Sequence, residues 1–580
     1  MKQPKWVGVI ASLSPSLKAL LALACFVFII TSFALLADVS ERFLVEVPRH
    51  GGDLTEGIIG RPRFINPVIA KSDADRDMVK LIYSGLMRAT PEGGLVPDLA
   101  ERYEISKDGL TYTFTLREPL YWHDGEPVSS LDVAFTIEKV KDPGLAIKSP
   151  RRAAWEGVLV ETPDPKTVVF TLKQSYAGFL ENTTMEIIPK HIWENVPSEE
   201  FDVTYYNIEP IGSGPYRINR VKRDDEKGLP SWYDLLAFKR YALGEPFITR
   251  LRIQFFGNNR ELAQAYADGS VQQMHTIEPA YARELEKKGA ALERAPLPRV
   301  FAAYFNQNQQ PIFADQKVRE TLALAIDKER IVEEVLYGYG VTIESPLPFL
   351  GDGSRENAES TQEERIAKAK SILESAGWAQ NAAGIYEKTN KAKKQVQLLE
   401  FSVAIPDVAE LRRAAELMKG DWEKLGASVT LKVYEPSTFA IEVLSPRKYD
   451  ILFYGQVTGR TPDPFVYWHS SQRNAPGLNV ALYANKTVDR LLEDARKEQD
   501  EAERTLALMK FNETLSAETP AIFLYSPDFL YAVSPRVRGM KTGLVTTESE
   551  RFLDIHNWYV ESEHVWKLFV EEQNQQISNI

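Results

Sequence analysis

The side chains that most often carry covalent or metal chemistry are few in this sequence and widely spaced. The one cysteine, Cys25, lies inside an apolar run, and a single thiol forms neither an intrachain disulfide nor a cysteine-based zinc site. The seven histidines form no H-E-x-x-H motif or other close pair, and a G-x-S-x-G turn is absent. We therefore predict no catalytic residue, no metal site and no cofactor.

Two motifs with chemically suggestive residues are better explained by turns of the backbone. The segment from Trp122 to Gly125, WHDG, combines an aromatic anchor with a glycine turn at the end of a strand. The segment from Gly212 to Tyr216, GSGPY, lacks the spacing and the lysine of a phosphate-binding loop. Both motifs are predicted to shape the chain and not to bind a substrate.

The composition of the chain is that of a globular protein. Of its 580 residues, 44% are hydrophobic and 26% are charged, as in ordinary folded domains. At roughly 100 to 200 residues per domain, the length of the chain predicts three or four domains or lobes. The 69 Lys and Arg against 81 Asp and Glu leave a net charge of −12, which disfavours binding to a phosphate backbone. We expect no nucleic-acid partner.

One segment near the N-terminus is long and apolar enough to cross a membrane. Residues 19–37 carry no charge, and nineteen helical residues at about 1.5 Å each cover roughly 28 Å of hydrocarbon. Three lysines precede this segment, whereas Asp38 and Glu41 closely follow it. The positive-inside rule then places residues 1–18 in the cytoplasm and the bulk of the chain outside the cell membrane, as a single-pass protein.

Two processing routes compete with a retained anchor. Residues 32–34, Ser-Phe-Ala, resemble a small-x-small cleavage site, which would make the segment a signal peptide. Residues 23–25, Leu-Ala-Cys, faintly resemble a lipoprotein box, although Cys25 lies inside the apolar run and not at its end. Because the apolar run is longer than a usual signal-peptide core and continues past residue 34, we predict an uncleaved anchor.

Helix and strand patterns are mixed along the exported part, which predicts an α/β fold. Apolar and polar residues alternate in 110–116 and nearly so in 167–172, as in half-buried strands. Residues 130–140 between them predict a helix, with Ser129 or Ser130 as its N-cap. Residues 522–525 predict a buried strand. Further helices are predicted after three cap residues, which are Asp315, Asp327 and Asn485.

Several motifs follow one another along the chain in a recognisable order. They are FINP (64–67), YWHDGEPVSSLDVAF (121–135), GSGPY (212–216), PIFAD (311–315), YDILFYG (449–455) and TPAIFLY (519–525). In this order they resemble the family 5 extracellular solute-binding proteins of bacterial ABC transporters, a group that contains oligopeptide- and dipeptide-binding proteins. The resemblance covers about residues 50 to 557.

The resemblance implies a type II periplasmic-binding-protein fold, with two lobes around a hinged cleft and an extra inserted domain. The first lobe would comprise residues 50–80, 206–300 and 528–560. The inserted domain would comprise 81–205 and the second lobe 301–527. Residues 561–580 lie beyond the resemblance and form a C-terminal tail, which is either a short amphipathic helix with Val565, Leu568 and Phe569 or a solvated segment. The two crossovers between the lobes would be hinge residues, namely Tyr304, Phe305 and Asn306 with Phe523, Leu524 and Tyr525.

The segment from Gly455 to Trp468 departs from the pattern of the peptide-binding relatives. Those proteins typically have a Trp soon after the glycine and an Asp four residues before the proline. The carboxylate of that Asp holds the amino terminus of a peptide. Here Gln456 stands at the Trp position, and Arg460 or the neighbouring Gly459 stands at the Asp position. A guanidinium suits carboxylate or phosphate groups, so we expect an anionic or atypical peptide-like solute in place of a free-amine dipeptide.

The candidate ligand contacts are therefore drawn from this segment and from the first strand. They are Glu56, Tyr454, Gln456, Arg460, Asp463 and Trp468. Each also has a structural interpretation, because aromatic residues are more often core and an Asp between prolines is often a turn residue.

The function that this sequence predicts is capture of a peptide or peptide-like small solute and its delivery to the permease subunits of an ABC importer. A receptor or chaperone of the same fold without a transporter is an alternative. A hydrolase is a weaker alternative, because the sequence has no G-x-S-x-G turn and no readable zinc motif. It stays open because spacing alone does not reveal a scattered Ser, His and Asp set.

Overall fold

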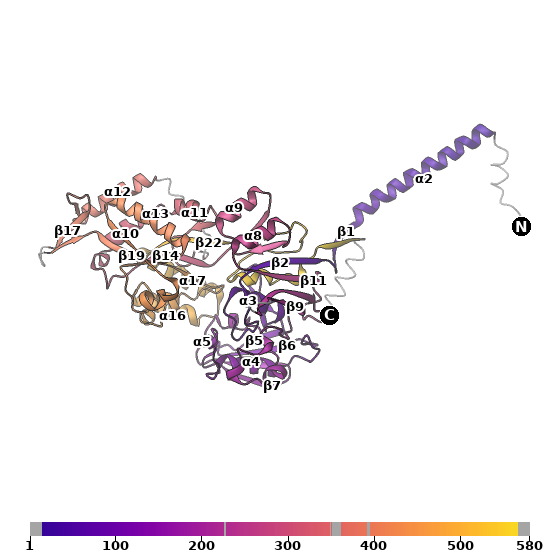
Figure 1. The fold of residues 1–580 in the computed structure, drawn as a ribbon, viewed down its shortest axis with the longest axis horizontal. Coiled ribbons are helices and arrows are strands. Elements are labelled where there is room, and N and C mark those ends of the chain that lie inside the picture. The colour runs from indigo at the N-terminus through magenta and orange to yellow at the C-terminus, as the bar shows by residue number, and fades with distance from the viewer. Residues whose placement is uncertain (1–13, 225–227, 349, 351–360, 391–394, 567–580) are drawn as a thin grey trace. The chain divides into compact units, whose positions relative to one another are not determined.

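The computed structural model describes residues 14–224, 228–348, 350, 361–390 and 395–566. These residues belong to two compact units, one formed by the two ends of the chain up to Gly52 and from Tyr559, and the other by Asp53–Trp558. Figure 1 shows the fold, and each unit is described by itself below.

The terminal unit contains one long helix and a two-stranded sheet. Helix α2 (Pro15–Phe43) includes a stretch, Pro15–Phe33, that is long and apolar enough by length and composition to cross a membrane. Strand β1 (Leu44–Arg49) pairs antiparallel with β23 (Glu561–Trp566), with Leu44 opposite Trp566. The beginning of the predicted C-terminal tail is thus a mostly exposed strand. The amphipathic helix is wrong for residues 561–566, because backbone pairing with β1 overrides the local pattern. Residues 567–580 lie outside the described residues.

The main unit is built on one mixed sheet that runs through both lobes. In its described part the strand order is β20-β19-β21-β14-β22-β12-β2-β11-β10-β9, with β13 and β15 also paired to β22. The strands of the first lobe are β2 (Asp53–Ile59), β9 (Tyr216–Arg223), β10 (Pro230–Ala237), β11 (Arg250–Phe256), β12 (Gln273–His275) and β13 (Ala291–Pro296). Those of the second lobe are β14 (Arg299–Phe305), β15 (Gly340–Thr342), β19 (Glu400–Pro406), β20 (Ser428–Tyr434) and β21 (Ile451–Val457).

The first lobe carries the helices α3 (Asp73–Ile82), α8 (Asn259–Ala267) and α9 (Pro279–Lys287). Asp75 in the first turn of α3 organises the loop before it, since its carboxylate accepts hydrogen bonds from the backbone N–H groups of Arg63 at 2.8 Å and Phe64 at 2.9 Å. Ser72 caps the helix in a capping box with Asp75. The FINP motif is therefore a loop held by a helix cap.

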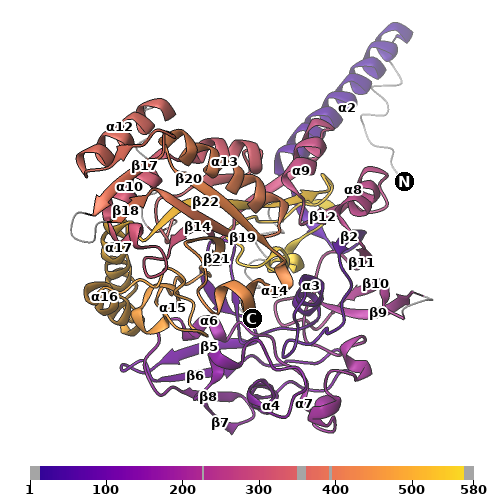
Figure 2. The same ribbon diagram turned by 60° about the vertical axis from the view of Figure 1, so that its left-hand side comes forward.

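The second lobe packs helices on both faces of its part of the sheet. The helices are α10 (Gln316–Ala325), α11 (Lys328–Val335), α12 (Gln362–Ser375), α13 (Ala409–Leu425), α14 (Pro436–Phe439), α15 (Phe465–Trp468), α16 (Lys486–Lys497) and α17 (Glu501–Glu518). Alternate residues of a strand point to opposite faces: Ala303 and Phe305 enter the core under α10 to α13, while Ala302 and Tyr304 enter the core under α14 to α17. Figure 2 shows the two helix layers.

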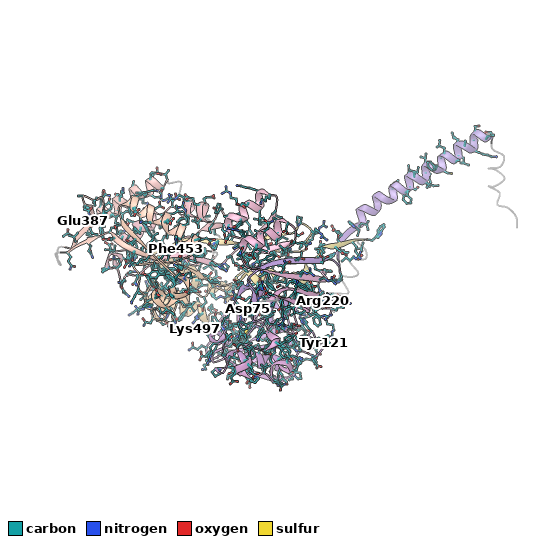
Figure 3. The ribbon with its side chains drawn as sticks, viewed as in Figure 1. Asp75, Tyr121, Arg220, Glu387, Phe453 and Lys497 are labelled. Atoms are coloured by element: carbon teal, nitrogen blue, oxygen red, sulfur yellow. The ribbon has the colours of Figure 1, made fainter. Side chains whose placement is uncertain are left out.

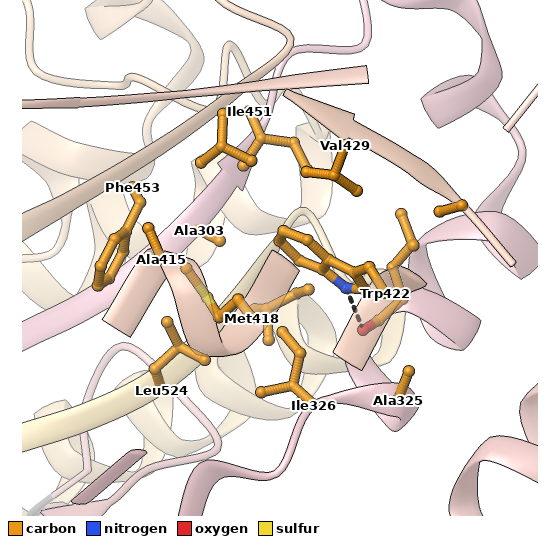
Figure 4. Packing of buried hydrophobic residues seen from close by; sticks show 14 of the residues in the cluster. Ala303, Ala325, Ile326, Ala415, Met418, Trp422, Val429, Ile451, Phe453 and Leu524 are labelled. Atoms are coloured by element: carbon orange, nitrogen blue, oxygen red, sulfur yellow. Dashed lines mark hydrogen bonds between the residues drawn. The ribbon is translucent and has the colours of Figure 1, made fainter. Parts of the chain in front are cut away.

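The core under α10 to α13 is dense and apolar. Trp422 of α13 is fully buried, and its indole N–H donates a 2.9 Å hydrogen bond to the carbonyl oxygen of Leu322 in α10 (Figure 4). Phe453 and Ile451 of β21 pack on the same side, and Figure 3 shows Phe453 among the side chains of the second lobe. A small three-stranded sheet of β16 (Ala379–Gln380), β17 (Tyr386–Asn390) and β18 (Gln395–Leu398) borders this lobe.

The inserted part forms its own antiparallel sheet, which lies in the lower part of Figure 2. Its strand order is β5-β6-β8-β7, with a separate hairpin of β3 and β4. The elements are β3 (Met87–Ala89), β4 (Leu95–Pro97), β5 (Ala100–Ile105), β6 (Thr111–Leu116), α4 (Ser130–Lys141), α5 (Arg152–Trp155), β7 (Leu159–Asp164), β8 (Thr167–Thr171), α6 (Phe179–Asn182) and α7 (Lys190–Trp193). Phe170, Trp155 and Phe179 pack together in its core. The two strands and the helix predicted for this region are confirmed.

Two adjacent stretches of chain connect the lobes. Strand β22 (Ala521–Val533) pairs with β14 of the second lobe over its first half and with β13 over its second half. The other connection is residues 297–298 between β13 and β14, and the Ser526 hydroxyl donates a 2.7 Å hydrogen bond to the Leu297 carbonyl oxygen. The lobes are thus joined by a bonded pair of segments at 297–298 and 526–527.

Candidate functional site

The loop between β21 and α15 is one of the places where the second lobe contacts the other parts of the main unit. Gly459, with a φ of 76°, turns the chain there, and the Thr458 N–H is held by the Pro298 carbonyl oxygen at 2.8 Å. The next residue, Arg460, and its neighbour Thr461 face the first lobe and the inserted domain. We refer to residues 458–464 as the cleft loop.

The Arg460 side chain extends from the second lobe and binds three acceptors in the inserted domain and the first lobe. Its Nη1 donates to the Thr90 carbonyl oxygen at 3.0 Å, and its Nη2 donates to the Leu544 carbonyl oxygen at 3.1 Å and to the Glu550 carboxylate at 2.6 Å. Only 2% of its side chain is exposed. The guanidinium that the sequence offers to an anionic solute is paired here with a carboxylate of the protein itself.

A second contact follows directly along the chain. The Thr461 N–H donates a 3.1 Å hydrogen bond to the Glu181 carboxylate of the inserted domain. Burial raises the pKa of Glu181, with a smaller upward contribution from the charge of Glu550. Two carboxylates on the far side therefore meet two consecutive residues of the cleft loop.

Asp463, the acidic residue of the cleft loop, is paired within the second lobe. The Arg496 Nη2 atom lies 2.6 Å from an Asp463 carboxylate oxygen, and the Arg496 guanidinium also lies over the Phe465 ring, 4.1 Å from its centroid. Asp463 borders two small cavities, of about 20 and 10 Å³, each large enough for about one water molecule.

Gln456, Tyr454 and Trp468 lie at different depths beside this loop. Gln456 is 7% exposed and borders the smaller cavity together with Tyr467 and Trp468. Tyr454 stacks on Phe439, with 5.9 Å between ring centroids. Trp468 is 1% exposed and belongs to the core under α14 to α17. The structure therefore brings Gln456 and Asp463 to one cavity and places most of Trp468 in the core.

Glu56 lies away from the cleft loop, inside the first lobe. It is fully buried, and its carboxylate accepts hydrogen bonds from the Tyr531 hydroxyl at 2.6 Å and from the Arg551 Nε at 2.9 Å. These partners occupy both carboxylate oxygens, so the structure gives Glu56 an internal role.

Glu56 belongs to a buried charge network that sequence reasoning missed. Arg551 also binds Asp77, at 2.8 and 2.9 Å. His275 lies between Asp77 and Glu548, with nitrogen to oxygen distances of 3.1 and 3.3 Å. The network joins residues more than 470 positions apart, so no local motif could have revealed it; the acidic Glu56 inside an apolar strand was its one sequence signal.

The pKa values of the network follow from its opposed charges. Burial and Arg551 would lower the pKa of His275, but Asp77 and Glu548 outweigh them and raise it to about 9. Burial would raise the pKa of Glu548, but His275, Thr276 and Arg299 lower it to about 2. Burial likewise opposes ionisation of Asp77, yet Arg551 and His275 hold the pKa of that carboxyl below its usual range. His275 is therefore a cation at neutral pH.

The six residues predicted as hinges lie on the second-lobe side of the junction between the lobes. Tyr304 and Phe305 are buried in the two cores of that lobe, and the Asn306 amide donates to the Arg447 carbonyl oxygen at 3.0 Å. Phe523, Leu524 and Tyr525 are also buried there. In the described part of the chain, no group of three or more His, Cys, Asp or Glu side chains is arranged to hold a metal ion.

The chain matches the family model of the bacterial extracellular solute-binding proteins, family 5 Middle, over residues 94–477. This protein belongs to that family. Members of the family are binding proteins and not enzymes, so the chain is a solute-binding protein with the type II periplasmic-binding-protein fold. The fold class predicted from the sequence is confirmed.

Individual relatives extend the match over most of the chain. Oligopeptide-binding protein AppA of Bacillus subtilis is 28% identical and aligns with 85% of this chain and 90% of its own length. The structure of the ABC transporter substrate-binding protein CtaP from Listeria monocytogenes superposes with a TM-score of 0.72 at 26% identity, covering 88% of this chain and 100% of that one. NikZ from Campylobacter jejuni, solved in complex with Ni(L-His), gives 0.67 at 27% identity, with 87% and 99% covered.

Proposed function

We propose that this protein is an anchored extracytoplasmic receptor that captures a peptide-like solute between its lobes and delivers it to the permease of an ABC importer. The observation that carries the proposal is the paired connection at residues 297–298 and 526–527, which leaves the lobes free to close on a solute at the cleft loop. The names of the relatives support the solute class, because AppA is an oligopeptide-binding protein and CtaP an ABC transporter substrate-binding protein.

Bending at this connection would move the two lobes as bodies. The second lobe has large cores on both faces of its sheet, so its interior resists deformation. The connecting residues are few and belong to neither of these cores, although Leu297 and Ser526 are buried and residues 526–527 pair with β15. We therefore place the hinge at 297–298 and 526–527, next to the predicted crossovers and not within them.

Helix α2 would hold the receptor at the membrane. Its apolar stretch, Pro15–Phe33, has a mean hydropathy of 2.1, and the lysines before it favour a cytoplasmic N-terminus. A tethered receptor stays beside its permease, which raises the effective concentration of solute-loaded protein there. Mass spectrometry of the intact N-terminus on the membrane-bound protein tests this: a chain that begins near residue 35 or later would show a cleaved signal peptide.

The solute is best sought on the protein as purified. Native mass spectrometry of the full chain in mild detergent should reveal a co-purified molecule, and calorimetry should then give its affinity. In cells, deletion of this chain should abolish uptake of that solute, and deletion of the permease should have the same effect. Uptake that continues without the permease would instead support a receptor that works without a transporter.

A further inference from the structure

The acceptors around Arg460 form a site that is built for a guanidinium. The Thr90 and Leu544 carbonyl oxygens and the Glu550 carboxylate converge on one guanidinium group, and all three are acceptors. None of them belongs to the second lobe, whereas Arg460 does. We call Thr90, Leu544 and Glu550 the acceptor cradle.

The acceptor cradle is held in place by its own hydrogen bonds and does not depend on Arg460. The Glu550 carboxylate accepts from the N–H of Thr546 at 2.7 Å and from its hydroxyl at 2.8 Å. The Leu544 N–H donates to the Pro91 carbonyl oxygen at 2.8 Å, which ties the two loops of the cradle together. Gly543 permits this approach, because a Cβ atom there would lie 2.1 Å from the Pro91 oxygen. The cradle therefore persists when the lobes separate.

When Arg460 leaves, the cradle becomes an unoccupied cation site. The Glu550 carboxylate keeps its two hydrogen bonds from Thr546 but loses its cationic partner. The Thr90 and Leu544 carbonyl oxygens lose the Arg460 donor. The charge-assisted hydrogen bonds between Arg460 and the acceptor cradle favour the closed arrangement, whereas hydration of the separated charges opposes it.

We propose that Arg460 is a tethered occupant of a guanidinium-binding site, and that it latches the lobes closed until a solute with a guanidinium group displaces it. This inference deepens the proposed function, because it names the group by which a solute would compete. A planar guanidinium matches the spread of the three acceptors, whereas an ammonium offers a single point charge.

The probe that tests the site is methylguanidinium, added to the full chain. In the Arg460→Ala variant it should bind with a dissociation constant of about 1 to 10 mM, and it should raise the melting temperature that the substitution lowers. The wild-type chain should show no such response, because Arg460 fills the site. Tetramethylammonium at equal concentration has no N–H donor and should have no effect.

Two variants separate the site from general effects of the salt. Adding Glu550→Gln to Arg460→Ala should abolish the response, since the charged acceptor is gone. Arg413→Ala removes an exposed arginine of the second lobe that pairs with Glu334 at 2.5 Å, and this variant should not respond. A response of equal size in either control, or no response in Arg460→Ala, overturns the proposal.

A distance measurement tests the latch even if Arg460→Ala is unstable, because the distance between the lobes can be measured on the wild type as well. Spin labels at Leu159 of the inserted domain and Leu478 of the second lobe, both exposed, are placed in a Cys25→Ser background. Without solute the wild type should show one short distance, and 1 M NaCl should leave it dominant because the ion pair is buried. The Arg460→Lys variant should show a second population with a longer distance between the labels. An already open wild type would overturn the latch.

A third arm distinguishes a free solute from a peptide side chain. In Arg460→Ala, N-acetyl-arginine amide and a tripeptide with a central arginine are compared with their citrulline counterparts, which lack the charge. Arginine forms that bind tenfold or more tightly than citrulline forms support the site, and equal binding counts against it. Because methylguanidinium contains no peptide group, its result is independent of whether the protein binds peptides at all.

Discussion

The Arg551 guanidinium and the Asp77 carboxylate form a two-bond ion pair that is sealed inside the first lobe, with distances of 2.8 and 2.9 Å and 2% or less of either side chain exposed. Arg551 lies in the short helix η6 (Glu548–Phe552), and Asp77 lies in α3. The same short helix supplies Glu550 to Arg460 of the second lobe. The buried network thus fixes the element that carries Glu550 of the acceptor cradle.

Removing Arg551 should strongly destabilise the protein. Arg551→Met leaves the buried Glu56 carboxylate without its cation and Asp77 with His275 alone, and the loss of one partner of a buried pair costs about 3 to 5 kcal/mol. Denaturant unfolding of the full chain measures this. The matched control is Arg413→Ala, whose exposed pair should contribute less than about 1 kcal/mol. Equal losses in the two variants would contradict a structural role for the buried network.

The charge on His275 makes stability depend on pH. Its pKa in the folded protein is about 9, above the usual value of about 6.5 in an unfolded chain. Protonation therefore stabilises the folded state fully below about pH 6.5, and this contribution, about 3 kcal/mol, is lost as the pH rises through about 9.

The His275→Gln variant tests this sign. The free energy of unfolding of the wild type should fall between pH 7 and 9, and the variant should be less stable at pH 7 but show a flatter profile over that range. A variant with the same slope as the wild type would assign the pH dependence to other groups.

Gly212 should not tolerate a side chain, because the backbone of α3 lies against it. A Cβ atom at Gly212 would lie 1.9 Å from the Ile82 carbonyl oxygen, so Gly212→Ala must displace the chain and should cost about 2 kcal/mol or more. Gly420 in α13 is the matched control, because its Cβ would meet nothing within 4 Å and Gly420→Ala should stabilise the helix by up to about 1 kcal/mol. Thermal melts of the two variants should therefore shift in opposite directions.

What the sequence predicted correctly depended on neighbouring residues. Asp315, Asp327 and Asn485 each cap the helix expected after them, because capping is a local interaction. The role of Arg460 was not local: its charged partner Glu550 lies 90 positions away, and only the closed arrangement of the lobes brings them together. Glu56 was noticed for its charge, yet its partner Arg551 lies 495 positions away, so its internal role could not be read from the chain.

Arg496 should matter more than its partner Asp463. The pair is partly exposed, at 34% and 18% of the two side chains, so Asp463→Asn should cost only about 1 kcal/mol. Arg496→Ala also removes the contact with the Phe465 ring, and its cost should be about 2 kcal/mol. Denaturant unfolding without solute measures both. If Asp463→Asn is instead as stable as the wild type and loses solute affinity, the carboxylate acts on the solute and not on the cleft loop.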